Sequence, residues 1–308
     1  KKRRRSSVAN VSIIDSMGNT KGALDSHRPT PLIALFSYSG VRGPTLWAMH
    51  RELRLFDKHG VNFLFLSVDD DALISRSRSK ILSAFWQNPS LDVCVMVDHD
   101  VEWDEGELLA LAVKCKQVQS CVSGVYSSRA IGKGAASRPK KDGLMMHART
   151  DELIEAEYLS GGFLAIPRIV VKNVLEAGEK AREVMGSEPR VDTTDFYELA
   201  NQALHACAYN SGPPIYDFFR PICVPRTYER ADLPPMKDAP YEFLSEDWAF
   251  SWRCRMAIPN RPLYLWSLPW LRHHGEFAYT MQTAFAPGAE SVVSEGTNDQ
   301  REGKVSLR

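Results

Sequence analysis

The feature that most constrains the fold is the segment 94–103, CVMVDHDVEW, in which an apolar run stops abruptly at two acids. Such a run is typical of a strand buried on both faces of a sheet, and ligands of open α/β sheets gather beyond the carboxyl ends of these strands. Because side chains alternate along a strand, Asp98 and Asp100 are expected on one side of this edge and His99 on the other. Paired carboxylates there suit Mg²⁺ or Mn²⁺ carrying a phosphate-rich substrate. The alternative is a strand-to-loop turn, where aspartate is favoured for its backbone hydrogen bonds alone.

Apolar runs alternate with amphipathic segments on both sides of this strand. This alternation predicts an α/β fold in which a mostly parallel central sheet is flanked by helices in a single domain. The expected strands are 31–39, 61–68, 120–128 and 158–168, the last of which contains a glycine pair. The expected helices are 45–60, 75–88, 106–117, 169–185 and 195–210.

The balanced charge of the chain selects no class of partner, and the polar composition of both ends predicts flexible tails. The 308 residues carry 38 basic and 38 acidic side chains, so no global field selects nucleic acid or membrane as a partner. We expect flexible tails at 1–30, which opens with KKRRR, and at 286–308, on either side of a domain over 31–285. The basic runs at 1–5 and 129–141 are interpreted as solvated segments, with a nucleic-acid contact as the alternative.

Two observations bear on the compartment. No stretch has the length and apolarity of a membrane span, and the six cysteines show neither a C-x-x-C pair nor a regular framework. We therefore expect a soluble protein of a reducing compartment, cytoplasm or nucleus. A membrane-anchored luminal enzyme from which the anchor has been trimmed is the alternative.

Several motifs, taken in order, resemble those of the GT-A-fold nucleotide-sugar glycosyltransferases of bacterial and phage type. The motifs are D-x-D at 98–100, Ser160-Gly161-Gly162-Phe163, Ser245-Glu246-Asp247 and His273-His274-Gly275. The resemblance covers most of 31–279. It implies a GT-A-like, Rossmann-like fold whose half 31–128 binds the nucleotide sugar and whose half 150–285 binds the acceptor. It also implies a hexosyltransferase that uses a UDP- or GDP-sugar as donor and Mn²⁺ or Mg²⁺ as cofactor.

The resemblance assigns the metal to the D-x-D motif and the late histidine. Asp98 and Asp100 match the motif, and His274 fits the His-Gly spacing better than His273. A cation in this position offsets the negative charge that develops on the departing nucleoside diphosphate. A lone histidine is more often a structural hydrogen-bonding group, which is the alternative for His274.

Donor recognition is implied for two arginine-bearing segments and for the glycine pair. Basic side chains near a helix N-terminus suit a diphosphate, and glycine lets backbone amides approach a ligand closely. The alternatives are a solvated helix face for the arginines and a bulge in a strand for the glycines. The donor-binding residues so implied are Arg76, Arg78, Asp98, Arg129, Gly161 and Gly162.

The Ser-Glu-Asp motif is the candidate for acid–base chemistry. By the family pattern Asp247 is the base that takes the proton of the acceptor hydroxyl, and Glu246 binds acceptor or orients the loop. Ordinary capping is the alternative, with Ser245 as N-cap and two acids in the first helical turn. A retaining enzyme has no need of a base here, and its acids would contact acceptor instead.

Other functions remain open from the sequence. A sugar-phosphate nucleotidyltransferase also uses an α/β sheet and a metal, and SGVRGPTL after the first strand faintly resembles its glycine-rich loop. A non-catalytic glycan- or nucleic-acid-binding module is the third class. For a transferase the acceptor is a glycan, a protein hydroxyl or hydroxymethylated DNA, and the sequence does not choose among them.

Overall fold

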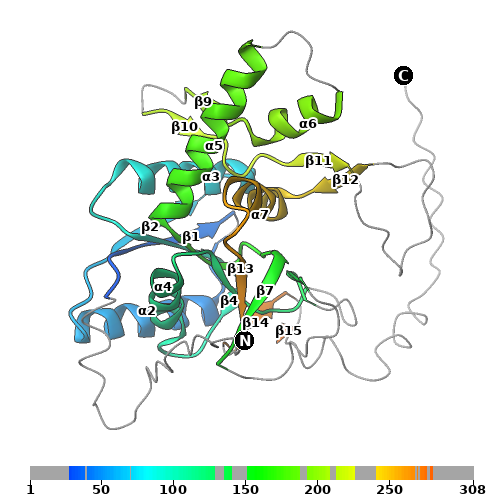
Figure 1. The fold of residues 1–308 in the computed structure, drawn as a ribbon. Coiled ribbons are helices and arrows are strands. Elements are labelled where there is room, and N and C mark those ends of the chain that lie inside the picture. The colour runs from blue at the N-terminus through cyan, green and yellow to red at the C-terminus, as the bar shows by residue number, and fades with distance from the viewer. Residues whose placement is uncertain are drawn as a thin grey trace, which may run out of the picture.

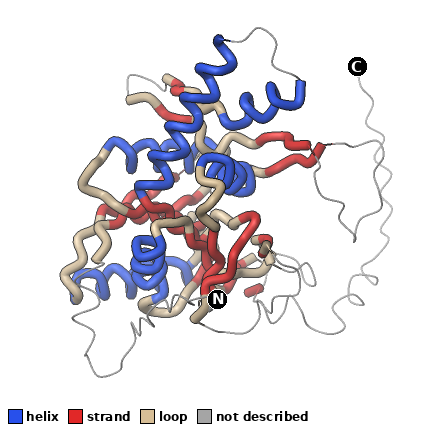
Figure 2. Tube along the Cα trace, in the orientation of Figure 1, coloured by secondary structure: helices blue, strands red, loops and turns tan. Residues whose placement is uncertain are grey.

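The computed structural model describes the central part of the chain (Figures 1 and 2). The residues that it describes are 28–38, 40–69, 71–128, 135–140, 151–187, 193–208, 213–225, 241–267, 269, 271–275 and 278–279. Arg129, the basic run 1–5 and the predicted C-terminal tail therefore lie outside the described residues.

A central sheet of eight strands organises the molecule. Its strands are β1 (Pro31–Ser37), β2 (Leu64–Asp69), β3 (Val93–Asp98), β5 (Val122–Gly124), β6 (Arg138–Pro139), β7 (Leu153–Tyr158), β8 (Phe163–Pro167) and β13 (Leu263–Trp266). They lie in the order β2-β1-β3-β8-β5-β13-β7-β6. β7 and β8 are antiparallel to their neighbours, so the other six strands share one direction. The predicted α/β architecture with a mostly parallel sheet is confirmed.

Helices cover both faces of this sheet (Figure 1). α2 (Gly43–Lys58) and α4 (Glu107–Val118) pack on one face. α3 (Ile74–Gln87), α5 (Arg168–Ser187) and α7 (Glu246–Ala257) pack on the other, and α6 (Thr193–Gln202) lies beside α5. Alternate residues of β1 and β3 enter the two cores, which explains why both strands are apolar throughout.

Short strands complete the fold at its periphery. β4 (Val101–Glu102), β14 (Arg272–His274) and β15 (Ala278–Tyr279) form a three-stranded sheet with β14 in the middle. β9 (Ala206–Cys207) pairs with β10 (Ile215–Tyr216), and β11 (Ile222–Pro225) pairs with β12 (Tyr241–Leu244), which leads directly into α7. The β4–β14 pairing brings the late histidines beside the segment that follows the D-x-D motif.

A buried carboxylate ties α2 to the start of α4. Glu52 is fully buried and accepts hydrogen bonds from the backbone N–H groups of Gly106 and Leu109, both at 2.8 Å, and from Trp103 Nε1 at 3.3 Å. Burial disfavours the charged form and raises the pKa of Glu52 to about 7, although the three donors oppose this shift. The carboxylate fixes the chain just after the segment that carries Asp98 and Asp100.

The structure corrects two strand and helix assignments. Gly161 and Gly162 lie between β7 and β8 rather than inside one strand over 158–168. β7 itself was not predicted, because the segment lacks an apolar run, although its inward residues alternate with glutamates in the period of a strand. The helix expected over 195–210 ends at Gln202, after which the chain enters β9.

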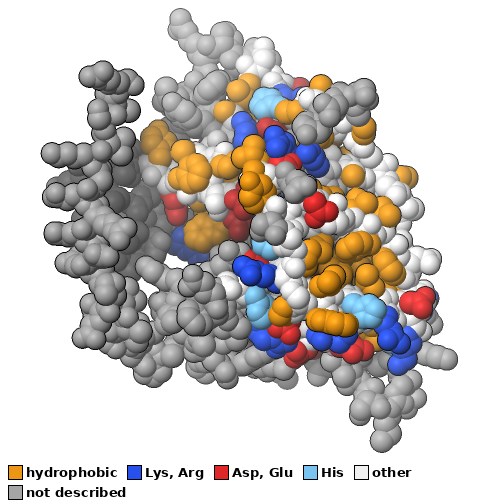
Figure 3. All heavy atoms as spheres, turned by 180° about the vertical axis from the view of Figure 1, so that it is seen from behind, with side chains coloured by type: hydrophobic (Ala, Val, Ile, Leu, Met, Phe, Trp, Pro, Cys, Tyr) orange, Lys and Arg blue, Asp and Glu red, His pale blue; other side chains and the backbone are white. Residues whose placement is uncertain are grey.

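The surface mixes apolar and charged side chains. Large apolar residues with more than half of their area exposed include Tyr38, Leu46, Trp47, Leu73 and Phe243. Figure 3 shows hydrophobic side chains interspersed with lysine, arginine and histidine on the face seen from behind. Within the described residues, none of the helices combines the length and apolar character that crossing a membrane requires.

Candidate functional site

The D-x-D motif lies where the sheet strands end. β3 finishes at Asp98, and Asp100 occupies the turn before β4 with only 1% of its area exposed. The backbone of this turn is held on three sides. Asp98 N–H donates to the carbonyl of Gly162 at 3.0 Å, Arg42 N–H to His99 at 2.9 Å and His274 N–H to Asp100 at 2.7 Å. The two aspartates therefore sit in a rigid turn at the carboxyl edge of β1, β2 and β3.

Arg78 joins this turn to the acidic motif of α7. Its side chain is buried, and Nη2 donates to both carboxylate oxygens of Asp98, at 2.8 and 3.0 Å. Nη1 lies 3.6 Å from Oε1 of Glu246. Burial disfavours the charged guanidinium, but the carboxylates of Asp98 and Glu246 outweigh it and hold the pKa of Arg78 above its ordinary value. Arg78 is thus a permanent cation between the two acidic motifs.

The glycine pair makes room for protein side chains. A Cβ atom on Gly161 would lie 1.5 Å from Nη1 of Arg78, and one on Gly162 would lie 2.5 Å from the hydroxyl of Tyr126. Gly162 N–H also donates to that hydroxyl at 3.0 Å. Both positions must therefore lack a side chain for Arg78 and Tyr126 to pack as they do.

Tyr126 is a site residue that sequence reasoning missed. Its side chain is buried, and burial together with the nearby charge of Asp98 raises its pKa, so the hydroxyl remains protonated near neutral pH. The residue follows β5, whose carboxyl end lies at the same sheet edge as that of β3. Strand direction was the signal that could have pointed to it.

The acidic motif stands at the start of α7. Asp247 accepts hydrogen bonds from Gly161 N–H at 3.3 Å, Ser245 Oγ at 2.7 Å and Trp248 N–H at 2.8 Å. Ser245 occupies the N-cap position, but its hydroxyl bonds to Asp247 rather than to a helix amide. Burial raises the pKa of Glu246, and repulsion from Asp247 adds to the shift while Arg78 opposes it. The motif is therefore organised around its carboxylates more than around helix capping.

The late histidines point in different directions. His273 Nδ1 lies 3.0 Å from the carbonyl oxygen of Ser127, and its Nε2 lies 3.6 Å from a carboxylate oxygen of Asp100. Because a carbonyl only accepts, Nδ1 carries the proton in this contact, and Nε2 faces the carboxylate of Asp100. His274 Nε2 instead contacts Glu102 at 2.8 Å. Adjacent residues of β14 face opposite sides, so the ring of His273 lies beside Asp100 and the ring of His274 beside Glu102, while the backbone N–H of His274 donates to Asp100.

The two predicted arginines of α3 also separate. Arg76 forms an ion pair with Asp71 at 2.6 Å, and 43% of its side chain is exposed, whereas Arg78 enters the site. Two residues along a helix differ by about 200°, so both side chains could not face the same ligand. The predicted donor contact of Arg129 lies outside the described residues.

The available donor atoms fit a metal that shares its coordination with a substrate. Asp98 and Asp100 carry carboxylate oxygens, and Nε2 of His273 lies 3.6 Å from one oxygen of Asp100; carboxylate and imidazole are both ligand types that Mn²⁺ accepts. Within the described ranges, no three or more histidine, cysteine or acidic side chains converge into a metal cage. Mg²⁺-type ions commonly bind one or two carboxylates and complete their shell with substrate phosphates and water. The residues therefore fit a metal that arrives with a diphosphate.

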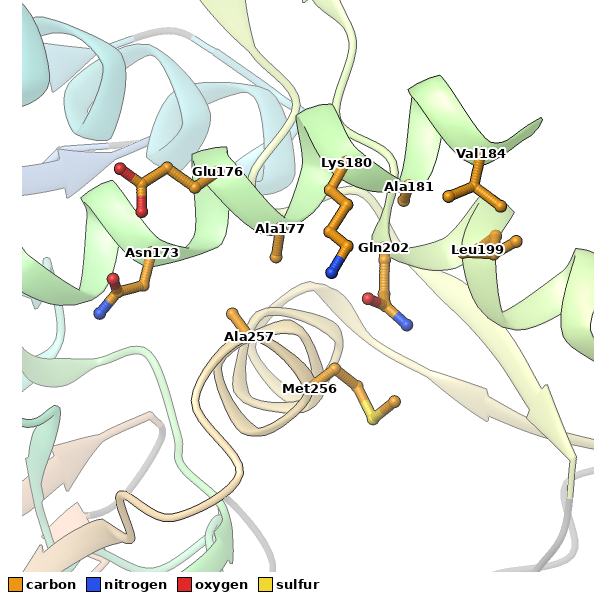
Figure 4. A pocket seen from close by; sticks show the side chains of 10 residues that line it. All are labelled: Asn173, Glu176, Ala177, Lys180, Ala181, Val184, Leu199, Gln202, Met256 and Ala257. Carbon is orange, nitrogen blue, oxygen red and sulfur yellow. The ribbon is translucent and has the colours of Figure 1, made fainter. Parts of the chain in front are cut away.

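A cavity lies away from these acids. It has a volume of about 410 Å³ and is lined by residues of α5, α6 and the last turn of α7, including Lys180, Gln202 and Met256 (Figure 4). Glu246 and Asp247 occupy the opposite end of α7. The cavity is therefore separate from the acidic site.

Known proteins resemble this chain only distantly. No protein-family model and no curated protein sequence matches it. Among solved structures, A197 from STIV is 14% identical with a TM-score of 0.44, over 82% of this chain and 91% of that one. GalNAc-T7, solved with UDP, GalNAc and Mn²⁺, is 9% identical with a TM-score of 0.41, over 81% of this chain and 44% of that one. A putative glucose-1-phosphate thymidylyltransferase from Bacillus anthracis is 10% identical with a TM-score of 0.31, over 61% and 89% of the two chains.

Such similar structures thus include both glycosyltransferases and sugar nucleotidyltransferases. At these identities and TM-scores the likeness does not identify an activity.

Proposed function

We propose that the protein is a metal-dependent glycosyltransferase that moves a sugar from a UDP- or GDP-sugar to an acceptor hydroxyl. The observation that carries this proposal is the meeting of Asp98 and Asp247 around Gly161 and Gly162, at one edge of the sheet. Sugar transfer needs a site for the diphosphate and a separate carboxylate for the acceptor proton. The two acidic motifs offer these two functions side by side.

Asp98 and Asp100 are proposed to hold Mn²⁺ or Mg²⁺ together with the phosphates of the donor, and His273 lies beside Asp100. When bound, the ion supplies charge that stabilises the departing nucleoside diphosphate. Neighbouring groups of the protein orient these side chains, because Nη2 of Arg78 donates to both oxygens of Asp98 and Nδ1 of His273 donates to the carbonyl of Ser127. Such outer hydrogen bonds are typical of metal-ligating carboxylates and imidazoles.

Asp247 is proposed to take the proton of the acceptor hydroxyl. Its hydrogen bonds to Gly161, Ser245 and Trp248 fix the orientation of the carboxylate. A carboxylate has about four acceptor positions, so one remains for an acceptor hydroxyl. Glu246, with 21% of its side chain exposed, is proposed to accept a second hydrogen bond from the acceptor. These roles correspond to an inverting reaction.

The test is release of nucleoside diphosphate from a panel of nucleotide sugars in the presence of Mn²⁺. We expect release from one donor, and a loss of about 100-fold or more in both Asp100→Asn and Asp247→Asn. Asp57→Asn, a change at an exposed position of α2, is the matched control and should leave the rate unaltered. A full rate in Asp100→Asn would refute the role of the D-x-D turn. No release from any donor, with glycan extracts and DNA present, would refute the proposal, and pyrophosphate exchange into a nucleoside triphosphate would replace it with a nucleotidyltransferase.

A further inference from the structure

We infer that Arg78 is a positioning residue that clamps the donor-side Asp98 and the acceptor-side Glu246 into one rigid unit, without contacting the donor itself. The inference rests on the proposed function, because it assigns those two acids to donor and acceptor. Its structural content, a clamp between the end of β3 and the start of α7, stands on the geometry alone.

The guanidinium is enclosed by three elements of the fold. Nη2 bonds to both oxygens of Asp98 from β3, and Nη1 faces Glu246 of α7. Its Cζ atom lies 5.8 Å from the ring centroid of Phe36 in β1, which places a cation near an aromatic face. Arg78 thus joins two strands and a helix that are far apart in sequence.

Accessibility separates this role from donor binding. The side chain of Arg78 is 3% exposed, whereas that of Asp98 is 24% exposed. The carboxylate therefore bonds to the guanidinium and still has part of its surface exposed. A donor phosphate can approach Asp98 through a bound cation, but it meets Arg78 only after displacing protein atoms.

Gly161 completes the clamp. Nη1 and Cζ of Arg78 lie 1.5 and 2.3 Å from the position of a Cβ atom on residue 161, so any side chain there would displace the guanidinium. The N–H of Gly161 also bonds to Asp247. The absence of a side chain at position 161 thus lets the guanidinium of Arg78 lie beside both Asp98 and Glu246.

The pair on the acceptor side has room to tighten. Nη1 of Arg78 makes no hydrogen bond, although it is buried, and Oε1 of Glu246 lies 3.6 Å away. A movement of about 0.7 Å would bring the two atoms to a usual hydrogen-bond distance. A movement of Glu246 on acceptor binding would therefore shift the planar guanidinium of Arg78, which also bonds to Asp98. Lysine cannot do this, because it presents a point charge in place of a fork.

Hydrogen exchange measured by mass spectrometry tests the clamp without any substrate. In Arg78→Met we expect peptides covering 96–103 and 244–250 to exchange together, each about tenfold faster than in the wild type. Arg182→Met, at an exposed position of α5, makes the same chemical change outside the site and should alter neither peptide. If Arg78→Met does not fold, Arg78→Lys keeps the charge and most of the volume and should show the same paired loosening. Faster exchange in only one peptide, or in neither, would overturn the inference.

Kinetics then separate positioning from donor contact. In Arg78→Lys we expect kcat to fall about 100-fold while KM for the donor stays within about threefold. A rise in donor KM at unchanged kcat would mean that Arg78 binds the donor and would overturn the inference. Paired loosening in a protein that releases no nucleoside diphosphate from any donor would keep the clamp and refute the transferase. Release at normal rates from Arg78→Met would keep the transferase and refute the clamp.

Discussion

Replacing Gly161 by alanine should destabilise the fold only when Arg78 is present. The added Cβ atom would overlap Nη1 at 1.5 Å, far below any van der Waals contact. Gly161 has no positive φ, so the expected penalty is steric and not conformational. Arg78 escapes the overlap by moving away from Asp98, which breaks an ion pair of 2.8 Å whose guanidinium is buried and whose carboxylate is partly exposed.

The loss of stability in Gly161→Ala depends on whether the protein tolerates the overlap or breaks the Arg78–Asp98 pair. Removing one partner of a buried pair costs about 3–5 kcal/mol, and overpacking a core costs about 1–3 kcal/mol. We therefore expect Gly161→Ala to lower the free energy of unfolding by about 3 kcal/mol. In an Arg78→Ala background the space is already open, and the same change should cost less than about 1 kcal/mol. The coupling energy between the two changes is then about 2 kcal/mol, within the range measured for residues in contact.

Urea denaturation of the four proteins of this cycle measures the coupling directly. Gly186→Ala is the control, because it lies in α5 and a Cβ atom there would meet nothing within 4 Å. Alanine is favoured over glycine in a helix by about 1 kcal/mol, so the control should be neutral or stabilising. Equal costs of Gly161→Ala in both backgrounds, within about 0.5 kcal/mol, would refute the packing argument.

Three further changes probe other parts of the structure. His273→Gln should weaken Mn²⁺ binding about tenfold in calorimetry and His274→Gln by less than twofold, because only the ring of His273 faces Asp100. A larger effect of His274→Gln would favour His274 as the metal ligand. The pKa of Glu52 is raised to about 7, so the folded state binds a proton that the unfolded state has lost, and the free energy of unfolding should fall as pH rises from about 4.5 to 7. Denaturation at several pH values should show that Glu52→Gln removes this slope. An unaltered slope would exclude Glu52 as its source. Tyr126→Phe should lower the free energy of unfolding by about 1–2 kcal/mol, since a buried N–H loses its acceptor, and no loss would mean that the N–H finds another.

Local sequence patterns predicted much of the central sheet. The strand ending at Asp98 was predictable because both of its faces are buried and its apolar run stops where burial stops. The inward position of Arg78 was also within reach, since it falls on the same helical face as the buried Leu82 and Phe85. That stripe distinguishes Arg78 from Arg76, although the sequence analysis treated both as donor contacts.

Other features depend on partners that are remote in sequence. The choice between His273 and His274 follows from the pairing of β14 with β4, which no spacing of histidine and glycine reveals. The need for glycine at 161 is set by Arg78, and such a contact becomes visible only when α3 and the β7–β8 connection are packed together. The alternation of apolar residues with glutamates in β7 is, by contrast, a local strand pattern that contains no apolar run. The positions of the histidine rings and the need for glycine at 161 therefore depend on contacts between distant segments and not on a local preference.

The position of β13 in the central sheet has a consequence for how the chain is made. Residues 263–266 fill the place between β5 and β7, so this strand leaves the ribosome long after both of its neighbours. Until then β5 and β7 each expose an unpaired edge, which is a template for pairing with other chains. A nascent chain of about 260 residues therefore holds most of its helices but an unfinished sheet. The unpaired edges of β5 and β7 remain open to aggregation until β13 inserts between them.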